Sequence, residues 1–466
     1  MLSLLGIRQV VVLVNKMDLV TYSETRFKDI CTTYGQFLKE ICVEPLSFIP
    51  IAARDGDNLI QPSHTMPWYK GLTVLDQMDT LQKETAKDAQ PLRFPIQDIY
   101  KFTESGDDRR IFAGTLASGT LSVGDAVVFY PSHKQSQIQT IEGFNLSPQS
   151  TVQSGQATGV TLATQLYIKP GEIMGKVSDP APLMGTTFKA SLFWLGKTPM
   201  LKGKKYKLKL ASSRSTVYLK DIVHTLDASD LTQSQKQQID RHDVAECILE
   251  TLKPIAFDTS FQYEDTSRFV IIDDYEIAGG GIVLESISQN HSILDTYVQK
   301  RDSAWEKSTI SGAQRALKFG QKPQFILITG ERKSGKNKLA KELEHSLYAL
   351  QKNVYYLGFS SILSEIGTSA QSLVDRDEHI QKLGLTAHLF TEAGFILISA
   401  ISDLDDAEVD ILKALVSPND MLMIHVGKDA TLSDDKIDYH VDDGPSGLSQ
   451  LTGFLQEKGV FPEYYL

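Results

Sequence analysis

The chain has 466 residues, 41% of them hydrophobic and 23% charged, which is enough for about three folded domains and excludes a disordered or fibrous protein. Its formal net charge of −11, from 58 acidic and 47 basic residues, argues against a nucleic acid as the main partner, because such binding depends on clustered Lys and Arg. The three cysteines (Cys31, Cys42 and Cys247) have neither disulfide-framework nor C-x-x-C metal spacing, which favours a reducing, cytoplasmic location and predicts no metal-ligand cluster.

The first 14 residues are mostly apolar. They lack the basic flank and cleavage site of a signal peptide and are too short to span a bilayer, so we expect no membrane contact. Within them, residues 9–14 form a mainly β-branched run, which is typical of a strand buried on both faces of a parallel sheet. Such a strand implies that earlier strands of the same sheet are missing or supplied elsewhere. A helix near residues 23–41 and a strand around 46–51 would complete a βαβ unit.

Two β-rich blocks are predicted next. Short alternating runs punctuated by glycine predict a small antiparallel barrel, and a second β-rich block follows it. In that second block the lysines of residues 202–210 alternate with apolar residues, which we interpret as the solvent face of an amphipathic strand. From Phe325 onward, strands and helices alternate again. The predicted domains are 1–85 (α/β), 90–182 and 183–290 (β-barrels), 291–322 (a polar connector with helix-forming character) and 323–466 (α/β).

A polar loop follows the first strand, at the position where open α/β sheets bind nucleotides. The Asp18 carboxylate can accept both the N1 and N2 hydrogens of guanine, a pair of donors that adenine does not offer. Asn15 can pair with the other edge of the base, and the stem of Lys16 can lie across the ring. Backbone N–H groups after the second strand could contact the guanine oxygen. The first loop alone fits an ordinary polar turn, but the two loops together predict a guanine site made of Asn15, Lys16, Asp18, Ala52 and Ala53.

The N-K-M-D and A-A-x-x-G-D-N motifs of these two loops, together with residues 66–75, resemble the translation-factor GTPases. They are most similar to the GTP-binding large subunit of bacterial ATP sulfurylase (sulfate adenylyltransferase). The pattern R-x-F-A-G-x-L-x-S-G-x-L-x-x-G-D from Arg110 resembles its second domain, and Trp194, P-I-A-F-D at 254–258 and R-F-V-I-I-D at 268–273 resemble its third. The resemblance covers residues 1–290.

This resemblance implies a partial P-loop GTPase domain and two β-barrels of the elongation factor Tu type. It further implies bound GTP, and a hetero-oligomer with a small catalytic subunit that forms adenylyl sulfate from ATP and sulfate. The family carries its own phosphate loop N-terminal to the matching position, and no G-x-x-x-x-G-K-[ST] precedes Asn15. Without that loop, phosphoryl transfer loses most of its electrostatic stabilisation, so we expect the chain as written not to hydrolyse GTP by itself.

A second phosphate loop is predicted at residues 330–337, between a strand (325–329) and a helix (about 338–351), which is the context of a Walker A motif. Lys336 would reach the β and γ phosphates of ATP. Asn337 stands where a Ser or Thr would ligate Mg²⁺, so we expect weakened metal-assisted transfer. The candidate phosphate-binding residues are Gly330, Ser334, Gly335, Lys336 and Asn337.

The C-terminal block resembles adenylyl-sulfate kinase. Besides the phosphate loop, residues 375–382 match D-R-x-E-N-I-R-R and residues 389–398 match L-F-x-D-A-G-x-I-V-I. The family's L-D-G-D-N-x-R is replaced by L-G-F-S-S-I-L at 357–363, and its S-P-Y-R by S-D-L at 402–404. No general base is evident, so we predict a degenerate kinase that still binds nucleotide, with its catalytic residues unknown.

Several charged residues have ordinary structural interpretations. Asp375 and Arg376 would equally form an ion pair at a helix start. His379 is interpreted as a solvated helix residue, and His224 and His242 as structural residues without metal-ligand spacing.

Two other functions stay open at this point. The chain could be a non-catalytic regulatory or scaffold protein whose nucleotide sites have decayed. It could also be a translation factor that delivers an aminoacyl-tRNA, which the acidic charge and the kinase-like tail disfavour. Co-purification of a sulfurylase small subunit would support either sulfate activation or the scaffold, and co-purification of tRNA would support the translation factor.

Overall fold

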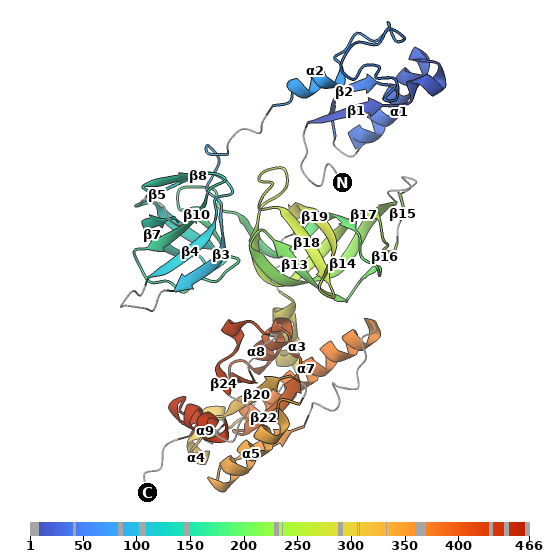
Figure 1. Cartoon of the computed structure of the whole chain (residues 1–466). Coiled ribbons are helices and arrows are strands. Elements are labelled where there is room, and N and C mark those ends of the chain that lie inside the picture. The colour runs from blue at the N-terminus through green and yellow to red at the C-terminus, as the bar shows by residue number, and fades with distance from the viewer. Residues whose placement is uncertain are drawn as a thin grey trace.

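The computed structural model describes residues 9–40, 43–82, 87–101, 109–143, 149–227, 233–234, 236–287, 292–304, 306, 308–331, 333–358, 370–427, 432–441 and 447–461. Two β-barrels lie side by side in the middle, with one α/β unit from the first part of the chain and another from the last part (Figure 1). The predicted fold class, α/β units combined with all-β barrels, is therefore confirmed. Across these described ranges, no helix is long and apolar enough to cross a membrane.

The N-terminal unit is a parallel βαβ arrangement, as predicted. Val14 at the end of the first strand pairs with Pro50 at the end of the second. Val14, Met17, Phe27 and Met66 form a small core between the strands, the long helix and the following loop. The elements are β1 (Val10–Val14), η1 (Met17–Val20), α1 (Glu24–Glu40), β2 (Pro45–Pro50) and α2 (Val74–Asp79).

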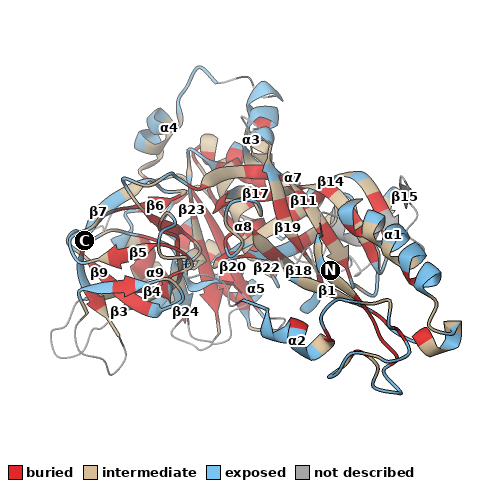
Figure 2. Ribbon diagram, turned by 90° about the horizontal axis from the view of Figure 1, so that it is seen from above, coloured by how far each residue is buried: buried red, intermediate tan, exposed pale blue. Residues whose placement is uncertain are grey.

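Strand β1 is less buried than its sequence suggested. Only Val14 is buried in it, and Leu13 is 43% exposed. The prediction of a strand buried on both faces is wrong for this structure, because within the described residues β1 pairs with β2 alone. Figure 2 shows the same contrast, since buried residues concentrate in the barrels and the C-terminal sheet while α1 and α2 are largely exposed.

The first barrel is closed by six antiparallel strands in the order β10-β3-β4-β9-β7-β6. Gly114 is needed where two paired strands approach closely, because a Cβ there would lie 2.2 Å from the carbonyl oxygen of Pro95. The strands are β3 (Phe94–Lys101), β4 (Arg110–Thr115), β6 (Ala126–Tyr130), β7 (Lys134–Glu142), β9 (Ala157–Leu162) and β10 (Ile173–Lys176), with a small ribbon of β5 (Thr120–Ser122) and β8 (Thr151–Gln153).

The second barrel also closes, because β13 pairs with β18 on one side and with β14 on the other. Its core contains Trp194 and Tyr206, whose rings meet edge to face. The main strands are β11 (Leu183–Trp194), β13 (Lys205–Leu210), β14 (Ser213–Asp227), β17 (Asp243–Phe257), β18 (Arg268–Asp273) and β19 (Glu276–Ser286). Shorter pieces are β12 (Met200–Leu201), β15 (Gln233–Ser234) and β16 (Gln238–Ile239).

The prediction that the lysines of β13 form a solvent face is only partly correct. Lys207 and Lys209 are exposed, as expected for the solvent face of an amphipathic strand. Lys205 on the same face is instead largely covered, because carboxylates of the C-terminal unit contact it.

The C-terminal unit is a five-stranded parallel sheet in the order β21-β22-β20-β23-β24, with helices on both faces. Every residue of β20 is buried. Phe325 and Leu327 pack with α7 and α8 on one face, while Ile326 and Ile328 pack with α5 and α9 on the other. The elements are β20 (Gln324–Gly330), α5 (Lys336–Ala349), β21 (Val354–Leu357), α7 (Ala370–Glu392), β22 (Ile396–Ser402), α8 (Asp406–Val416), β23 (Asp420–Val426), η2 (Asp434–Lys436), β24 (Tyr439–Val441) and α9 (Gly447–Glu457).

Two helices, α3 (Ile293–Ala304) and α4 (Gly312–Phe319), follow the second barrel in the chain and precede this sheet. Apolar residues of α3, among them Ile293 and Tyr297, pack against the core of the C-terminal unit. Helix α4 begins at a capping box in which Ser311 and Gln314 bond each other's backbone N–H groups. The predicted helix-forming character of this segment is therefore correct.

Candidate functional site

The first candidate site lies at the ends of β1 and β2. Asn15 and Lys16 follow β1 and are exposed, and Lys16 has a left-handed backbone with φ 69°. After this left-handed residue, the side chain of Met17 is buried in the core. The Met17 N–H donates to the carbonyl oxygen of Ile51 at 3.2 Å. Asp18 follows in η1, half-buried.

The structure brings the two predicted guanine loops into direct contact. The side-chain oxygen of Asn15 accepts from the backbone N–H of Lys16 at 2.7 Å and from that of Ala53 at 3.1 Å. Ala52 is buried, and its carbonyl oxygen accepts from Asp55 and Gly56 in a tight turn. The N–H of Ala53, which sequence analysis assigned to a guanine oxygen, thus donates to Asn15 here.

Asn58 shapes the second loop, a role that sequence analysis did not assign. Its buried carboxamide donates to the carbonyl of Pro50 at 2.9 Å and accepts from the N–H of Ser63 at 2.8 Å. Next to it, the Asp57 carboxylate accepts from the hydroxyls of Ser63 and Thr65. Both residues belong to the G-D-N motif of the sequence. Their hydrogen-bond partners Ser63 and Thr65, however, lie five to eight residues further along the chain.

The second candidate site is the phosphate loop between β20 and α5. Gly330 is required at the end of β20, because its φ is 150° and a Cβ would lie 2.5 Å from the carbonyl oxygen of Val426. Gly335 is the N-cap of α5 with φ 78°, and its carbonyl oxygen accepts from the N–H groups of Lys338 and Leu339. The N-terminus of α5 therefore faces the loop, which is the arrangement that favours a bound anion.

Two polar side chains lie within this loop. Lys336 is only 4% exposed, and its Nζ donates to the carbonyl oxygen of Glu331 at 2.8 Å. The hydroxyl oxygen of Ser334 is buried without a hydrogen-bond partner in the described part of the chain. A phosphate oxygen would satisfy the Ser334 hydroxyl, and the Lys336 ammonium supplies a positive charge in the same loop, so the loop residues fit a nucleotide phosphate.

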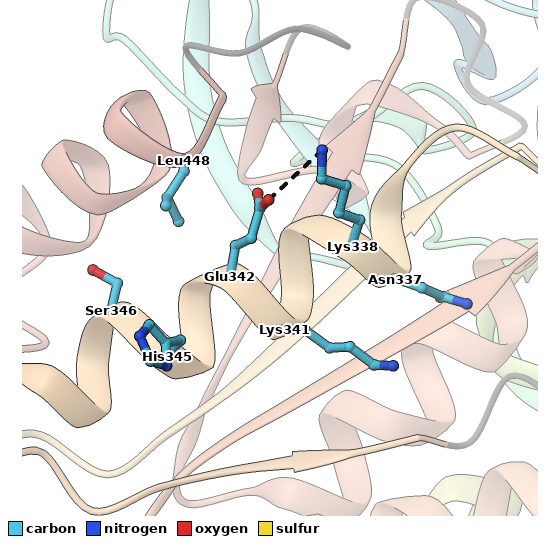
Figure 3. Close-up of a pocket in the computed structure, with 7 residues that line it drawn as sticks. All are labelled: Asn337, Lys338, Lys341, Glu342, His345, Ser346 and Leu448. Carbon is cyan, nitrogen blue, oxygen red and sulfur yellow. Dashed lines mark ion pairs between the residues drawn. The ribbon is translucent and has the colours of Figure 1, made fainter.

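Asn337 follows the loop in the first turn of α5. It is exposed and lines a hollow of about 820 Å³ along the flank of α5 (Figure 3). Lys338 and Glu342, which form an ion pair at 3.7 Å, and Leu448 of α9 border the same hollow. The structure thus gathers Gly330, Ser334, Gly335 and Lys336 at the loop and places the Asn337 carboxamide beside it. A Mg²⁺ ion would find an amide here in place of the expected hydroxyl.

The kinase-like motif on α7 makes contacts that its sequence did not predict. Arg376 lies inside α7, where its guanidinium donates to both carboxylate oxygens of Glu408 on α8 and to the carbonyl oxygen of Asp403. A local ion pair at a helix start is therefore the wrong interpretation of Arg376. The side chain of Asp375 and residues 359–363 of the predicted departure lie outside the described residues.

The histidines have ordinary surroundings. His379 is half-buried on α7, and His224 lies 3.5 Å from the Glu246 carboxylate across the barrel strands. His242 turns the chain ahead of β17 with φ 74°, and its N–H donates to the carbonyl of Trp194. Among the described residues, no group of three or more His, Cys, Asp or Glu is placed to hold a metal ion.

Known proteins are similar to this chain over most of its length. Two family models match, "GTP-eEF1A C-terminal domain-like" at residues 187–284 and "Adenylylsulphate kinase" at residues 322–436. A bifunctional enzyme CysN/CysC of Rhodopirellula baltica is 30% identical over 435 residues, covering 91% of this chain and 66% of the relative. Sulfate adenylyltransferase subunit 1 of Aeromonas hydrophila is 32% identical over 320 residues, covering 66% of each chain.

A solved structure of sup35 complexed with GDP is similar with a TM-score of 0.41 and 21% identity, covering 61% of this chain and 71% of that one. The chain spans just under two thirds of the length of the curated relatives it matches.

Proposed function

We propose, from the premise that this chain is a homologue of the bifunctional CysN/CysC proteins and of sulfate adenylyltransferase subunit 1, that it is a nucleotide-binding component of sulfate activation. The predicted resemblance to these families is confirmed by the relatives and by the two family models. The N-terminal loops would hold the base of GTP, and the loop of residues 330–337 would hold the phosphates of ATP.

The phosphate loop is the observation that carries this proposal. Lys336 and Ser334 present buried polar atoms inside a glycine-bounded loop at the N-terminus of α5. Burying the Ser334 hydroxyl without a hydrogen-bond partner is costly, so the loop gains when an anion accepts a hydrogen bond from it. The Lys336 ammonium would stay near the phosphates as a positive charge, and the α5 backbone N–H groups would supply directional hydrogen bonds.

Calorimetric titration of the full chain with ADP tests this site. Lys336→Met should weaken ADP binding by about tenfold or more, because a charge-assisted contact to phosphate is worth roughly 1.5–3 kcal/mol. Lys338→Met is the matched control, since Lys338 is exposed on the same helix and pairs with Glu342. Equal losses in the two variants would mean that the basic flank of α5, rather than the loop, attracts the nucleotide.

The partner and the reactions are proposed from the relatives. We propose a hetero-oligomer with a small catalytic subunit that makes adenylyl sulfate from ATP and sulfate, supported by the likeness to sulfate adenylyltransferase subunit 1. Co-expression with such a subunit, followed by gel filtration, should give one complex. A chain that elutes alone in every nucleotide state contradicts this part of the proposal.

A second candidate is a non-catalytic scaffold, which the exposed carboxamide of Asn337 favours. Mg²⁺, when bound, would neutralise charge on the transferring phosphate, and Asn337 is a poorer ligand than a hydroxyl. We propose that the unmodified chain forms little phosphoadenylyl sulfate from adenylyl sulfate and ATP. Comparison with Asn337→Ser tests this proposal, and rapid turnover by the unmodified chain would overturn it.

A further inference from the structure

The edge of the sheet that carries the phosphate loop faces the two barrels. Gly330 at the end of β20 is in register with Ser402 of β22 on one side and with Val426 of β23 on the other. Both flanking strands run from this edge into segments that contact the barrels. Figure 1 shows α8 and α3 of the C-terminal unit close below the second barrel, with α5 and α9 further away.

The first contact follows β22. Three residues after Ser402, the chain reaches Asp405, which caps α8 by accepting from the backbone N–H of Glu408 at 2.9 Å. The other carboxylate oxygen of Asp405 lies 3.0 Å from the Nζ of Lys205, on β13 of the second barrel. One carboxylate therefore fixes the start of α8 and binds it to the barrel.

Lys205 lies among three carboxylates of the C-terminal unit. Besides Asp405, its Nζ is 3.2 Å from Asp377 and 3.9 Å from Glu408. The Lys205 side chain is 17% exposed and that of Glu408 only 1%. Burial opposes the charge on Lys205, but the three carboxylates, that of Asp405 most strongly, outweigh this effect and raise the pKa of its ammonium. Lys205 is therefore a charged group held at a covered contact.

The second contact follows β23. After Val426 the chain reaches η2, where Lys436 pairs with Asp410 of α8. Asp410 also lies 2.7 Å from the Nζ of Lys253, on β17 of the second barrel. In η2 itself, Asp435 lies 3.1 Å from the Nζ of Lys169 of the first barrel. Leu252, next to Lys253, is buried in the core of the C-terminal unit and adds an apolar anchor.

The two contacts share one charge pattern. The barrels contribute lysines, namely Lys169, Lys205 and Lys253, and the C-terminal unit contributes the carboxylates that meet them. We call this set of contacts the barrel joint. Along the chain, Asp405 follows β22 after two intervening residues and η2 follows β23 after seven, so the joint lies close in sequence to both strands that flank β20.

We propose that the barrel joint holds the edge of the phosphate loop in its nucleotide-binding arrangement, so that the joint and a nucleotide bound at this loop stabilise each other. The inference rests on the proposed nucleotide binding at residues 330–337 and adds to it a regulatory role for the second barrel. Fixing the flanking segments in advance removes an ordering cost from nucleotide binding. By linkage, a nucleotide bound at the loop must strengthen the joint by the same factor.

The decisive variant is Lys205→Met/Lys253→Met in the full chain, which keeps the aliphatic stems and removes the two charges that the second barrel contributes to the joint. The ADP dissociation constant should rise by about 5- to 30-fold, in the usual range for coupling between sites. Lys209→Met is the matched control, because Lys209 is exposed on the same face of β13, and its ADP affinity should stay within about twofold. Asp405→Asn is a milder variant that keeps the helix cap and removes one charge of the joint.

Amide hydrogen exchange of the same proteins gives an independent readout. In the double variant, exchange of residues 403–410 and 434–436 should speed up, and ADP should slow it in the unmodified chain. Unchanged exchange in the double variant would show that the joint does not hold this edge, and faster exchange with an unchanged ADP affinity would show that the two are not coupled. Either result overturns the inference. Failure of the unmodified chain to bind ADP would overturn the proposed function as well, which the titration detects separately.

Discussion

At the scale of single residues, the side chain of Asn15 joins the two loops that are predicted to bind guanine. Its carboxamide oxygen accepts from backbone N–H groups on both guanine loops, those of Lys16 and Ala53. The oxygen is used within the protein, so the carboxamide nitrogen is the group that would contact a base. The predicted pairing of Asn15 with one edge of the base must therefore use this nitrogen.

Asp18 is the residue expected to select guanine. Asp18→Asn replaces an acceptor-only carboxylate by an amide, which cannot accept both the N1 and the N2 hydrogens of the base. We expect affinity for GDP to fall by about tenfold or more, as for other sites whose charged hydrogen-bonding partner is lost, while binding of ADP at residues 330–337 is unchanged. Fluorescence titration with labelled GDP measures this, with Asp29→Asn on the exposed face of α1 as control. Equal affinity in Asp18→Asn and the control would place guanine selection elsewhere.

His388 on α7 provides a test of pH dependence. Burial lowers the pKa of its ring, and the guanidinium of Arg301 adds to this effect, while a hydrogen bond to the Val416 carbonyl opposes it. A histidine with a lowered pKa in the folded state stays neutral there while the unfolded chain takes up a proton. The free energy of unfolding should therefore fall as the pH drops below the unfolded pKa of about 6.5, and level off below the folded pKa.

The matched comparison is His388→Gln against His345→Gln, an exposed histidine on α5 of the same unit. Urea unfolding at pH 7.5 and pH 5.5 gives the two free energies for each protein. His388→Gln should show a smaller loss on acidification than the unmodified chain, and His345→Gln should not. A loss of the same size in all three would assign the acid sensitivity to other groups.

Lys205 shows what the sequence of a single strand cannot reveal. The alternation on β13 correctly placed Tyr206 and Leu208 inside and Lys207 and Lys209 outside. The same rule placed Lys205 in solvent, but the carboxylates that cover it come from positions 377, 405 and 408. A period-2 pattern separates the faces of a strand and carries no information about which distant segment packs on each face.

At the scale of elements, the phosphate loop was the most predictable feature. The buried strand β20 and the helix α5 follow directly from a continuous apolar run and from glycines at both ends of the loop. The helix begins at Lys336, two residues before its predicted start, because Gly335 adopts the left-handed conformation of a cap. The half-buried state of β1 was not predictable, since apolar content reports what a strand can bury and not how many neighbours it has.

One buried arginine joins α3 to the end of α8. Arg301 donates from Nη1 to the carbonyl oxygens of Leu415 at 2.6 Å and Ser417 at 2.5 Å, at the C-terminal end of α8. These carbonyls have no further helical turn to bond to, so the guanidinium completes the end of α8. The partners lie more than 110 residues away in the chain, so the polar pattern of the segment gave no indication of them.

Replacing this arginine should destabilise the C-terminal unit. Arg301→Met keeps the apolar stem but leaves two carbonyl oxygens without their donor, at a cost of about 2–4 kcal/mol. Lys300→Met changes an exposed neighbour on α3 and should cost at most about 0.5 kcal/mol. Calorimetric unfolding of the full chain compares them through the transition of the C-terminal unit. A similar shift for both variants would mean that α3 contributes little to that unit.

At the scale of the whole molecule, the two barrels are joined by a buried ion pair. The Nε and Nη2 atoms of Arg93 donate to the two carboxylate oxygens of Asp258 at 2.9 Å and 3.1 Å. Their side chains are only 1% and 2% exposed, and Thr266 donates a further hydrogen bond to Asp258. Arg93 precedes the first strand of one barrel and Asp258 follows β17 of the other, so this pair fixes their relative orientation.

A second ion pair near the same boundary is a natural control. Lys87 and Asp265 meet at 2.6 Å, but Asp265 is 45% exposed. Breaking a buried pair by removing one partner costs about 3–5 kcal/mol, because the remaining charge has neither solvent nor a counter-ion. Breaking an exposed pair costs at most about 1 kcal/mol.

We therefore expect Asp258→Asn to lower the stability of the paired barrels several times more than Asp265→Asn, although both changes remove one carboxylate between the same two barrels. Arg93→Met/Asp258→Leu should recover part of the loss of Asp258→Asn, because it removes the uncompensated guanidinium as well as its partner. Chemical unfolding measures all three variants, followed by the fluorescence of Trp194 in a background where Trp68 and Trp305 are replaced by Phe. Equal effects of Asp258→Asn and Asp265→Asn would mean that water reaches the Arg93 guanidinium, and the barrels would then be free to change their relative orientation.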